Sequence, residues 1–386
     1  MKKKLCLVMT SPFFLEVFLI AQIQALSKLY QVSVVVNTPD RALLTKLGLD
    51  AKLIQLRIER KIRPLHDIRA LLALIQIFRV ANFDLVHSAT PKAGLLAMAA
   101  AYITGISVRI HTFTGQVWGT KIGVARFTLK LADRGTAFFA SDILVDSSSQ
   151  RDFIIQEGIV PLKKASVLAN GSINGVNINR FRPAMEFREK IRVLYTIPMD
   201  AYVIIYMARL TRDKGAIMIA KIFAKYGFQN PGAHILIVGP DEESLLPKIK
   251  ELCNHCIDRV HFVGQVNCPE EYMAAADIFC LPSFREGFGT VFINAAAVGI
   301  PSIASRIYGS SDAVVDGETG CLFEPGNVDE CVKLLEHFAR NQALRYSMGF
   351  SARKRVVEKF SEELLTQALL DFYKKRLSGY TAYTSD

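Results

Sequence analysis

Segments of strand length and segments of helix length alternate along this chain, and the alternation runs through twice. In the first half, the strand candidates are short apolar runs at residues 5–9, 32–37, 52–56, 83–87, 108–113, 143–146 and 166–168. The segments of helical length between them are residues 14–29, 65–80, 92–103, 122–139 and 149–156. Strict alternation of this kind predicts a parallel, doubly wound sheet, which binds ligands at the carboxyl ends of its strands.

A stretch without periodicity, residues 170–183, is rich in Asn and Gly and is typical of a connection between domains. After it, the alternation restarts, with strand candidates at residues 203–207, 234–238, 260–263, 277–281 and 302–304. A chain of 386 residues is also longer than the chains that usually fold around a single hydrophobic core. We therefore predict an α/β protein in which two doubly wound, Rossmann-like domains face one another across a cleft.

Basic residues are concentrated in the first half. Residues 1–190 hold 26 Lys and Arg against 13 Asp and Glu, whereas residues 191–386 hold 21 against 23. This imbalance predicts an anionic partner, either a membrane or a nucleic acid. Nucleic acid is the weaker alternative, because the basic half shows no recognition helix or RNA-binding motif. Residues 56–80 fit a membrane surface or a solvated helix face, because basic side chains stand among Leu and Ile residues. The basic residues are Arg57, Arg60, Lys61, Arg63, Arg69 and Arg79.

The cysteines favour a reducing compartment, since seven is an odd number and they form no framework. Cys253 and Cys256 flank His255, but no fourth ligand stands at a spacing suited to zinc. No run of 18 or more uncharged apolar residues lies in a plausible spanning context. Pro12 and Glu16 interrupt the apolar N-terminal run, so we expect a strand, a loop and a helix there rather than a signal peptide. We expect a cytoplasmic protein, peripheral to a membrane.

Residues 283–290, Ser-Phe-Arg-Glu-Gly-Phe-Gly-Thr, carry the strongest chemical signal. They lie between an apolar run that predicts a buried strand and an alanine-rich run that predicts a helix. Such an arrangement aims free N–H groups and a positive dipole end at an anion. Glu286 would repel that anion unless it faced a neutral part of the ligand. A sugar diphosphate offers both parts, phosphates for the helix terminus and hydroxyls for the acid. The alternative is a glycine-rich surface turn without a ligand.

Other candidate side chains also follow predicted strands. Residues 209–215, Arg-Leu-Thr-Arg-Asp-Lys-Gly, leave the first strand of the second half, and their Arg209 and Lys214 suit a diphosphate. In the first half, His111 begins the run His-Thr-Phe-Thr-Gly near the end of a strand candidate, and His87 ends another. Each is either catalytic or a core histidine, and His111 is the stronger candidate. There is no Asp-x-Asp, so Arg, Lys and a helix dipole must neutralise the diphosphate, without a metal site.

These motifs resemble the family 4 retaining glycosyltransferases, which adopt the GT-B fold of two Rossmann domains. The second half is similar through Arg209 and Lys214-Gly215, through residues 281–289, and through residues 316–320 (Asp-Gly-Glu-Thr-Gly). The first half is similar to bacterial members that build lipid-linked glycans of the capsule or O-antigen type. That similarity lies in residues 87–94 (His-Ser-Ala-Thr-Pro-Lys-Ala-Gly) and 111–115. The resemblance covers nearly the whole chain.

The resemblance implies a role for each motif. Arg209 and Lys214 would hold the donor diphosphate and stabilise it as it leaves. Glu286 would bind hydroxyls of the donor sugar, and His111 would sit by the reacting sugar from the other domain. The turn that follows Glu286 would supply N–H groups to sugar and phosphate. Its donor-binding residues are Gly287, Phe288, Gly289 and Thr290.

One position departs from the family pattern, in which a second Glu follows the first after seven residues and holds the ribose. Here that position is Asn294. An amide can accept or donate a hydrogen bond, but it makes no charge-assisted one. Ribose affinity and the identity of the donor are therefore left open by the sequence.

We expect residues 1–182 to be an N-terminal acceptor-binding domain and residues 183–360 a C-terminal nucleotide-sugar domain. Residues 361–386 would be a helix and tail that pack back toward the N-terminal domain. We predict a retaining hexosyl- or N-acetylhexosaminyltransferase that works without cofactor or metal at the inner face of the cytoplasmic membrane. Its donor would be UDP-linked rather than GDP-linked, and its acceptor a saccharide on a polyprenyl diphosphate. The alternative is an epimerase or hydrolase of sugar nucleotides with the same fold.

The missing Asp-x-Asp generates the first test. We expect sugar transfer to continue in excess EDTA within a factor of about two or three, because cationic side chains take the place of a divalent ion. Transfer is measured with and without the chelator. Complete loss in EDTA, with recovery on adding manganese, would contradict this prediction.

Overall fold

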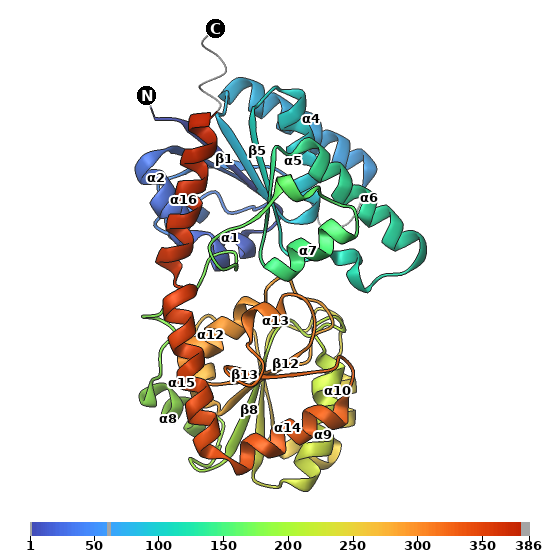
Figure 1. Ribbon diagram of the computed structural model, residues 1–386, viewed down its shortest axis with the longest axis vertical. Coiled ribbons are helices and arrows are strands. Elements are labelled where there is room, and N and C mark those ends of the chain that lie inside the picture. The colour runs from blue at the N-terminus through green and yellow to red at the C-terminus, as the bar shows by residue number, and fades with distance from the viewer. Residues whose placement is uncertain (1, 60–62, 380–386) are drawn as a thin grey trace. The chain divides into compact units, whose positions relative to one another are not determined.

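The computed structural model describes residues 2–59 and 63–379, which form two compact units (Figure 1). Unit 1 combines Met1–Asn174 with Glu362–Asp386, and unit 2 is Gly175–Ser361. Each unit has its own parallel sheet and its own hydrophobic core.

The sheet of unit 1 has the strand order β3-β2-β1-β4-β5-β6-β7, and neighbouring strands pair in parallel. Its strands are β1 (Lys4–Met9), β2 (Gln31–Val36), β3 (Lys52–Gln55), β4 (Leu85–Ala89), β5 (Val108–Phe113), β6 (Asp142–Val145) and β7 (Ala165–Val167). Its helices are α1 (Pro12–Phe18), α2 (Ile20–Leu29), α3 (Leu43–Lys46), α4 (Pro64–Ala81), α5 (Pro91–Ile103), α6 (Gly123–Phe139), α7 (Ser148–Gln156) and α16 (Glu362–Gly379). The strand order reverses between β1 and β4, which makes this position the topological switch point.

The sheet of unit 2 has the order β10-β9-β8-β11-β12-β13, again parallel throughout. Its strands are β8 (Tyr202–Met207), β9 (Ala233–Val238), β10 (Val260–Gly264), β11 (Ile278–Leu281), β12 (Ser302–Ser305) and β13 (Gly320–Phe323). Its helices are α8 (Met185–Leu194), α9 (Ala216–Gln229), α10 (Leu246–Leu252), α11 (Pro269–Ala275), α12 (Thr290–Val298), α13 (Ser310–Ala313), α14 (Val328–Arg340) and α15 (Gln342–Lys359). Here the switch point lies between β8 and β11.

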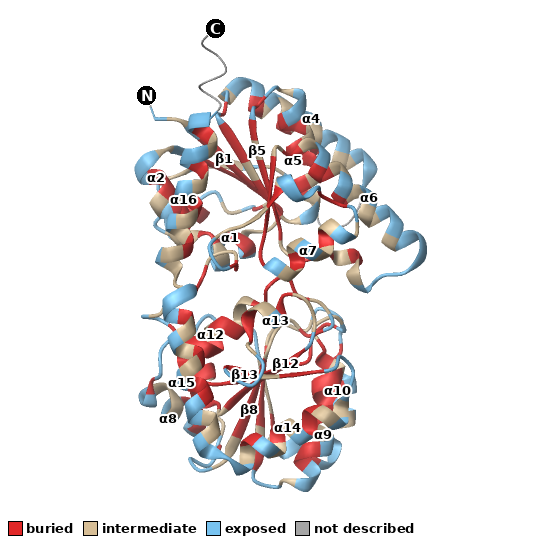
Figure 2. Ribbon diagram, viewed as in Figure 1, coloured by how far each residue is buried: buried red, intermediate tan, exposed pale blue. Residues whose placement is uncertain are grey.

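The central strands are buried on both faces in each unit (Figure 2). Helices cover both sides of a doubly wound sheet, which is why its strands are continuous apolar runs rather than alternating ones. The five residues from Leu5 to Met9 in β1 and all of β11 are buried accordingly. The predicted fold class is confirmed for each unit.

The boundary between the units falls after Asn174, earlier than the division expected after residue 182. The N–H of Val176 donates to the carbonyl oxygen of Phe360 at 2.8 Å, and Val176 also forms a bridge with Ser361. A Cβ at Gly175 would lie 2.6 Å from that same carbonyl oxygen. The chain from Gly175 onward is therefore held against the residues that follow α15, inside unit 2.

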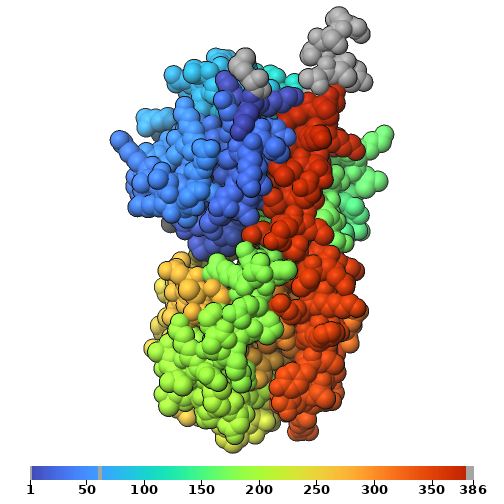
Figure 3. Space-filling view, turned by 90° about the vertical axis from the view of Figure 1, so that its left-hand side faces the viewer, coloured from blue at the N-terminus to red at the C-terminus, as the bar shows by residue number. Residues whose placement is uncertain are grey.

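The last helix, α16, packs on unit 1. Its buried residues Leu365, Leu369, Tyr373 and Leu377 stand four residues apart, so they form one face. This face contacts α2, and Figure 3 shows α16 lying along the N-terminal part of the unit. Arg376 in α16 adds an ion pair of 2.6 Å with Asp142. Residues 380–386 of the expected tail lie outside the described residues, as do Arg60 and Lys61.

The single helix expected at residues 14–29 is wrong. Helices α1 and α2 meet at a bend of 81°. Leu19 leaves helical geometry at the break, with φ −117° and ψ −2°, and its side chain is buried in the core. Among the described residues, the membrane-span criteria are met by no individual helix, whereas this bent pair meets them by length and composition alone.

Strand β13 and helix α8 were not predicted. β13 is only four residues long and begins inside the run Asp-Gly-Glu-Thr-Gly at residues 316–320. A Cβ at Gly320 would lie 2.1 Å from the carbonyl oxygen of Ser302, so this glycine lets β13 approach β12. Within the motif at residues 316–320, Gly320 is thus required by the packing of the sheet.

Candidate active site

Two loops of unit 2 meet at its switch point. The loop after β8 contains Arg209 and Lys214, and the loop after β11 contains Glu286. Because β8 and β11 pair in parallel, both loops leave the same edge of the sheet. In open α/β sheets, ligands bind outside the carboxyl ends of the strands at this point.

The two loops are in direct contact through Gly215. A Cβ at this position would lie 2.0 Å from the carbonyl oxygen of Pro282, and Gly215 has φ +72°. Both the close approach and the positive φ require glycine. The N–H of Phe284 donates to the carbonyl oxygen of Asp213 at 2.8 Å, which joins the loops a second time. The loop after β8 is also supported from the core, because the buried Tyr206 hydroxyl donates to the carbonyl oxygens of Arg209 (3.2 Å) and Lys214 (3.1 Å).

This contact brings Lys214 and Glu286 together. Lys214 Nζ lies 2.7 Å from Glu286 Oε2, and Ser283 Oγ donates to Glu286 Oε1 at 2.7 Å. The Glu286 side chain is 5% exposed and Ser283 is fully buried, whereas Lys214 keeps 20% of its side chain exposed. Both carboxylate oxygens therefore have a partner, as burial of a charge requires. Ser283 stands in the segment singled out from the sequence, but nothing in the pattern indicated that it would orient Glu286.

Arg209 lies on the same loop but pairs elsewhere. Its Nη1 is 2.6 Å from Glu242 Oε2, and about a third of each side chain is exposed. A solvent-exposed pair of this kind contributes little to stability. The Arg209 guanidinium can therefore leave Glu242 and bind an anionic ligand such as a phosphate with little loss of stability.

The turn before α12 has the geometry of an anion-binding helix start. Gly289 caps the helix with φ +80°, and a Cβ there would lie 2.6 Å from the ring of Phe292. Within the described structure, the N-cap residue of α12 makes no side-chain hydrogen bond to the first N–H groups of the helix. Phe288 is buried with its ring centroid 5.2 Å from that of Phe360, so it can offer only its backbone to a ligand. Gly287 is approached by the loop before α13, since a Cβ at Gly309 would lie 2.6 Å from the Gly287 carbonyl oxygen.

Asn294 lies on the same helix, one turn beyond Thr290. Residues four apart share a helix face, so Asn294 and Thr290 point to the same side of α12. The Asn294 side chain is half-buried. The candidate ribose residue thus lies one turn from the start of α12.

His111 is buried inside unit 1. His111 lies within strand β5, which ends at Phe113, as the strand candidate at residues 108–113 predicted. His111 Nδ1 is 2.8 Å from Ser88 Oγ on the neighbouring strand β4. A Cβ at Gly94 would lie 2.3 Å from His111 Cε1, so the first turn of α5 leaves room for the imidazole only because residue 94 is glycine. Burial lowers the pKa of His111 to about 3, and the ring is therefore neutral at physiological pH.

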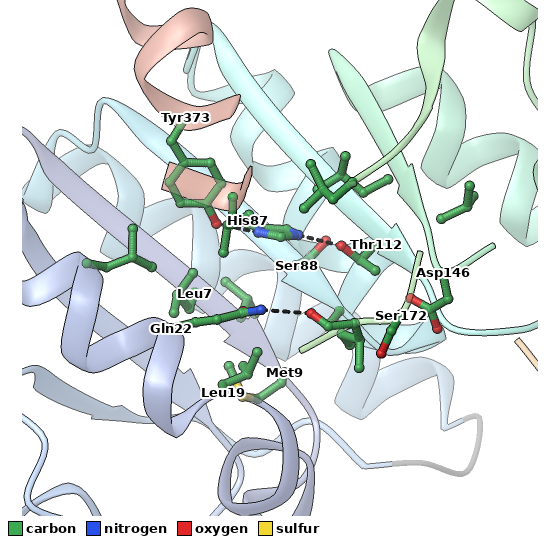
Figure 4. A pocket seen from close by; sticks show the side chains of 18 residues that line it. Leu7, Met9, Leu19, Gln22, His87, Ser88, Thr112, Asp146, Ser172 and Tyr373 are labelled. Carbon is green, nitrogen blue, oxygen red and sulfur yellow. Dashed lines mark hydrogen bonds between the residues drawn. The ribbon is translucent and has the colours of Figure 1, made fainter. Parts of the chain in front are cut away.

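His87 belongs to a separate polar cluster on the other side of the sheet (Figure 4). Its Nε2 is 2.7 Å from Thr112 Oγ1, and its Nδ1 contacts the hydroxyl of Tyr373 in α16. Burial lowers the pKa of His87 to about 3 and raises that of the nearby Asp146 to about 8. These groups line a cavity of about 40 Å³, which is large enough for water rather than for a sugar. The structure favours the core interpretation of His87.

Two family models match the chain. The model described as "Glycosyl transferases group 1" matches residues 187–355, and the "Glycosyl transferase 4-like domain" matches residues 17–171. The chain is also 31% identical over 318 residues to the capsular polysaccharide biosynthesis glycosyltransferase CapM of Staphylococcus aureus. That match covers 82% of this chain and 83% of CapM. The chain belongs to the family 4 glycosyltransferases.

Further relatives and solved structures agree with this assignment. The UDP-Gal:α-D-GlcNAc-diphosphoundecaprenol α-1,3-galactosyltransferase of Escherichia coli is 25% identical over 323 residues, 81% of each chain. The crystal structure of Anabaena HepE in complex with UDP-glucose has a TM-score of 0.82 at 19% identity, over 96% of this chain and 99% of that one. A lipopolysaccharide outer core galactosyltransferase, WaaB, has a TM-score of 0.69. The fold of this glycosyltransferase is thus GT-B, as the sequence predicted.

The predicted site residues of this glycosyltransferase divide by unit. Lys214 and Glu286 are brought into contact in unit 2, and Arg209 lies on the same loop with Glu242 as its partner. His111 is a buried, neutral group of unit 1. Tyr373 contacts His87 from a position 286 residues away in the chain, so no local pattern could have indicated it.

The neutral state of His111 can be tested by its effect on stability. An imidazole with a pKa of about 3 in the folded protein and about 6.5 in the unfolded chain takes up a proton on unfolding between those values. We expect wild type to gain stability relative to His111→Gln as pH rises from about 3 to about 6.5, by at most about 1.4 kcal/mol per pH unit. Above that range the difference should stay constant. Urea unfolding of both proteins at several pH values measures this difference in the free energy of unfolding. A difference that does not change with pH would show that burial does not lower the pKa of His111.

Proposed function

We propose that this glycosyltransferase retains anomeric configuration and moves a sugar from a UDP-linked donor to a saccharide on a polyprenyl diphosphate. The sugar transfer would take place at the inner face of the cytoplasmic membrane, in the synthesis of a surface polysaccharide or a protein-attached glycan. The observation that carries the proposal is the Lys214–Glu286 pair at the switch point of unit 2, beside the start of α12. Unit 2 is thereby assigned the donor and unit 1 the acceptor.

The pair explains how a carboxylate can stand beside a diphosphate. An isolated Glu286 would repel the phosphates, but Lys214 neutralises it at 2.7 Å. An ammonium group has three N–H donors, of which Glu286 takes one. The others remain for a phosphate oxygen, so Lys214 serves both anions. Glu286 is then free to accept hydrogen bonds from the hydroxyls of the donor sugar.

The proposed reaction is a substitution on one face of the sugar. The departing phosphate assists removal of the proton from the acceptor hydroxyl. Arg209, Lys214 and the N–H groups of the turn from Gly287 to Thr290 stabilise the negative charge that develops on the phosphate. One such preorganised donor typically contributes about 3–4 kcal/mol to the transition state, or roughly a hundred- to a thousandfold in rate. His111 remains a predicted catalytic residue, and as a neutral group it would act through hydrogen bonds rather than charge.

The relatives support the choice of donor and acceptor. The Escherichia coli relative is named for UDP-galactose as donor and α-D-GlcNAc-diphosphoundecaprenol as acceptor, and CapM for capsular polysaccharide biosynthesis. HepE was crystallised with UDP-glucose. These statements concern those proteins, and they are the reason for preferring UDP and a lipid-linked acceptor here.

A transfer assay separates this proposal from its alternative. The purified protein is incubated with a panel of labelled sugar nucleotides and a bacterial lipid extract, and label is measured in the organic phase. Transfer that requires the extract supports a glycosyltransferase with a lipid acceptor. Consumption of the donor at the same rate without extract would instead favour the epimerase or hydrolase.

The Lys214–Glu286 pair generates a prediction for two variants. Glu286→Gln keeps the shape but removes the charge, so turnover should fall by about two to three orders of magnitude. UDP affinity should change little, because the acid meets the sugar rather than the phosphates. Lys214→Ala should weaken UDP binding by about ten- to a hundredfold, since a charge-assisted bond is worth about 1.5–3 kcal/mol. Turnover is measured by transfer and affinity by calorimetry.

A matched ion pair outside the site provides the control. Lys190 and Glu271 are also 2.7 Å apart in unit 2. Glu271→Gln and Lys190→Ala make the same chemical changes and should alter neither turnover nor UDP affinity. Equal loss of UDP affinity in Glu286→Gln and Lys214→Ala would contradict the division of roles.

Asn294 generates a prediction about the ribose. If it faces the ribose, Asn294→Glu introduces a charge-assisted hydrogen bond, worth about 1.5–3 kcal/mol against about 1 kcal/mol for a neutral one. UDP should then bind several-fold more tightly, with turnover little changed, and Asn294→Ala should bind it more weakly. Calorimetric titration of UDP into the three proteins measures both effects. Weaker binding by Asn294→Glu would mean that the ribose is held by other residues.

A further inference from the structure

Helix α6 exposes a row of large apolar side chains on the surface of unit 1. The row, called here the α6 face, comprises Ile122, Val124, Phe127, Leu131 and Phe138, with exposed fractions of 88%, 79%, 64%, 56% and 68%. From Val124 onward the members stand three, four and seven residues apart, which places them on one side of the helix. The opposite side, with Thr136 and Ala137, is buried against the unit. Figure 2 shows exposed residues along α6.

A single exposed apolar residue is ordinary, but a continuous row marks an interaction surface. Amphipathic helices in globular proteins turn their apolar side inward, and α6 does so with Ala137 and with the partly buried Leu129 and Phe139. The side chains of the α6 face point outward instead. Within the described part of unit 1, Phe138 of the row contacts the ring of Tyr102 in α5, with centroids 6.1 Å apart, but all five members stay exposed.

The exposed charged residues of α6, together with the residue before its N-cap, are basic. The basic residues are Lys121, Arg126, Lys130 and Arg134. The acid of α6, Asp133, is buried and accepts a hydrogen bond of 2.7 Å from Trp118 Nε1. Glu157 of the following segment pairs with Arg126 and Lys130, which leaves Lys121 and Arg134 exposed beside the row. The described surface of α6 is thus apolar and basic, without an exposed acid.

Helix α4 extends this surface. It packs against α5, which in turn packs against α6, so α4 and α6 flank α5 on one side of the sheet. The exposed apolar residues of α4 are Leu65, Ile68, Leu72 and Val80, and Arg69 and Arg79 are exposed among them. Its acid, Asp67, is held by Lys92 at 2.8 Å. Residues 65–80 of the basic segment singled out from the sequence therefore present a second apolar and basic face, on the helix that flanks α5 opposite α6.

We propose that the α6 face, together with the exposed side of α4, docks on an anionic lipid bilayer. The apolar side chains enter the boundary between headgroups and acyl chains, and the basic side chains lie at the phosphates. A second copy of the chain would bring two basic surfaces together and be repelled, so charge complementarity favours lipid. The inference rests on the proposed function in that a lipid-linked acceptor is embedded in such a bilayer.

The position of the row within unit 1 gives the docking a consequence for the acceptor. Strand β5, which carries His111, ends at Phe113, and α6 begins at Gly123. In a βα unit the helix starts at the carboxyl edge of the sheet. Ile122, Val124 and Phe127 therefore lie toward the same edge as the end of β5. A saccharide on a membrane-embedded diphosphate would be presented at the edge where unit 1 binds ligands.

Vesicle binding of the full chain tests the proposal without donor or acceptor. The probes are phosphatidylcholine vesicles with and without phosphatidylglycerol, and bound protein is measured by sedimentation at low and high salt. We expect wild type to prefer the anionic vesicles and to lose much of this preference at high salt. The triple substitution Val124→Ser, Phe127→Ser and Leu131→Ser should weaken binding at least about tenfold at every salt concentration.

Two further proteins make the result specific. Phe228→Ser, Tyr346→Ser and Phe350→Ser together remove apolar side chains of unit 2 that are 75%, 68% and 72% exposed, and this control should bind like wild type. Lys121→Glu should weaken binding to anionic vesicles only. No vesicle binding by wild type, equal loss in the control, or a wild-type dimer that the triple substitution dissociates in sedimentation velocity would each overturn the proposal. UDP titration without vesicles tests the donor site alone, so failure of docking is distinguishable from failure of the proposed function.

Discussion

The ion pair between Lys214 and Glu286 joins the two loops at the switch point of unit 2, and the proposed donor site is built on it. A carboxylate that is 5% exposed is stable only when its charge is paired and its oxygens are bonded. Lys214 supplies the charge and Ser283 the second bond. Both partners reach Glu286 because the loops after β8 and β11 touch at Gly215 and Pro282. A β-carbon at residue 215 would separate the loops and leave the acid without its cation.

The same pair reconciles two requirements of a sugar-nucleotide site. A donor diphosphate needs cations and N–H groups, whereas donor-sugar hydroxyls are well held by a carboxylate. Placed side by side, a free carboxylate and a phosphate repel one another. An ammonium group between them offsets this repulsion. Its attraction to both anions is stronger in a partly buried site than in water. Arg209, which forms an exposed ion pair with Glu242, adds a second cation that can be redirected to a ligand at little cost.

In unit 1, the buried candidate residues are uncharged rather than paired. His87 and His111 are both buried and their pKa values are both lowered to about 3, so neither carries charge at physiological pH. His111 is packed against Gly94 and bonded to Ser88, while His87 connects the sheet to α16 through Tyr373. The charge of unit 1 lies instead on its surface, where Lys and Arg border the exposed apolar rows of α4 and α6. The uncharged histidines inside and the basic, apolar helix faces outside fit the role proposed for unit 1, which is to bind an acceptor at a lipid surface.

The sequence by itself determined the alternation of strands and helices, because buried parallel strands are continuous apolar runs and their helices have a recognisable length. It also placed Arg209, Lys214 and Glu286 after strands, and therefore at the ligand-binding edge of a sheet. It could not determine that β8 and β11 are neighbours, since strand order is decided by long-range pairing. Only that pairing put Lys214 against Glu286 and made Ser283 a partner of the acid. The unit boundary, the bend at Leu19 and the contact of Tyr373 with His87 were likewise decided by tertiary packing. The physical reason is the same in each case: the interacting groups are far apart in the chain, and local patterns carry no information about which distant segment will bury them.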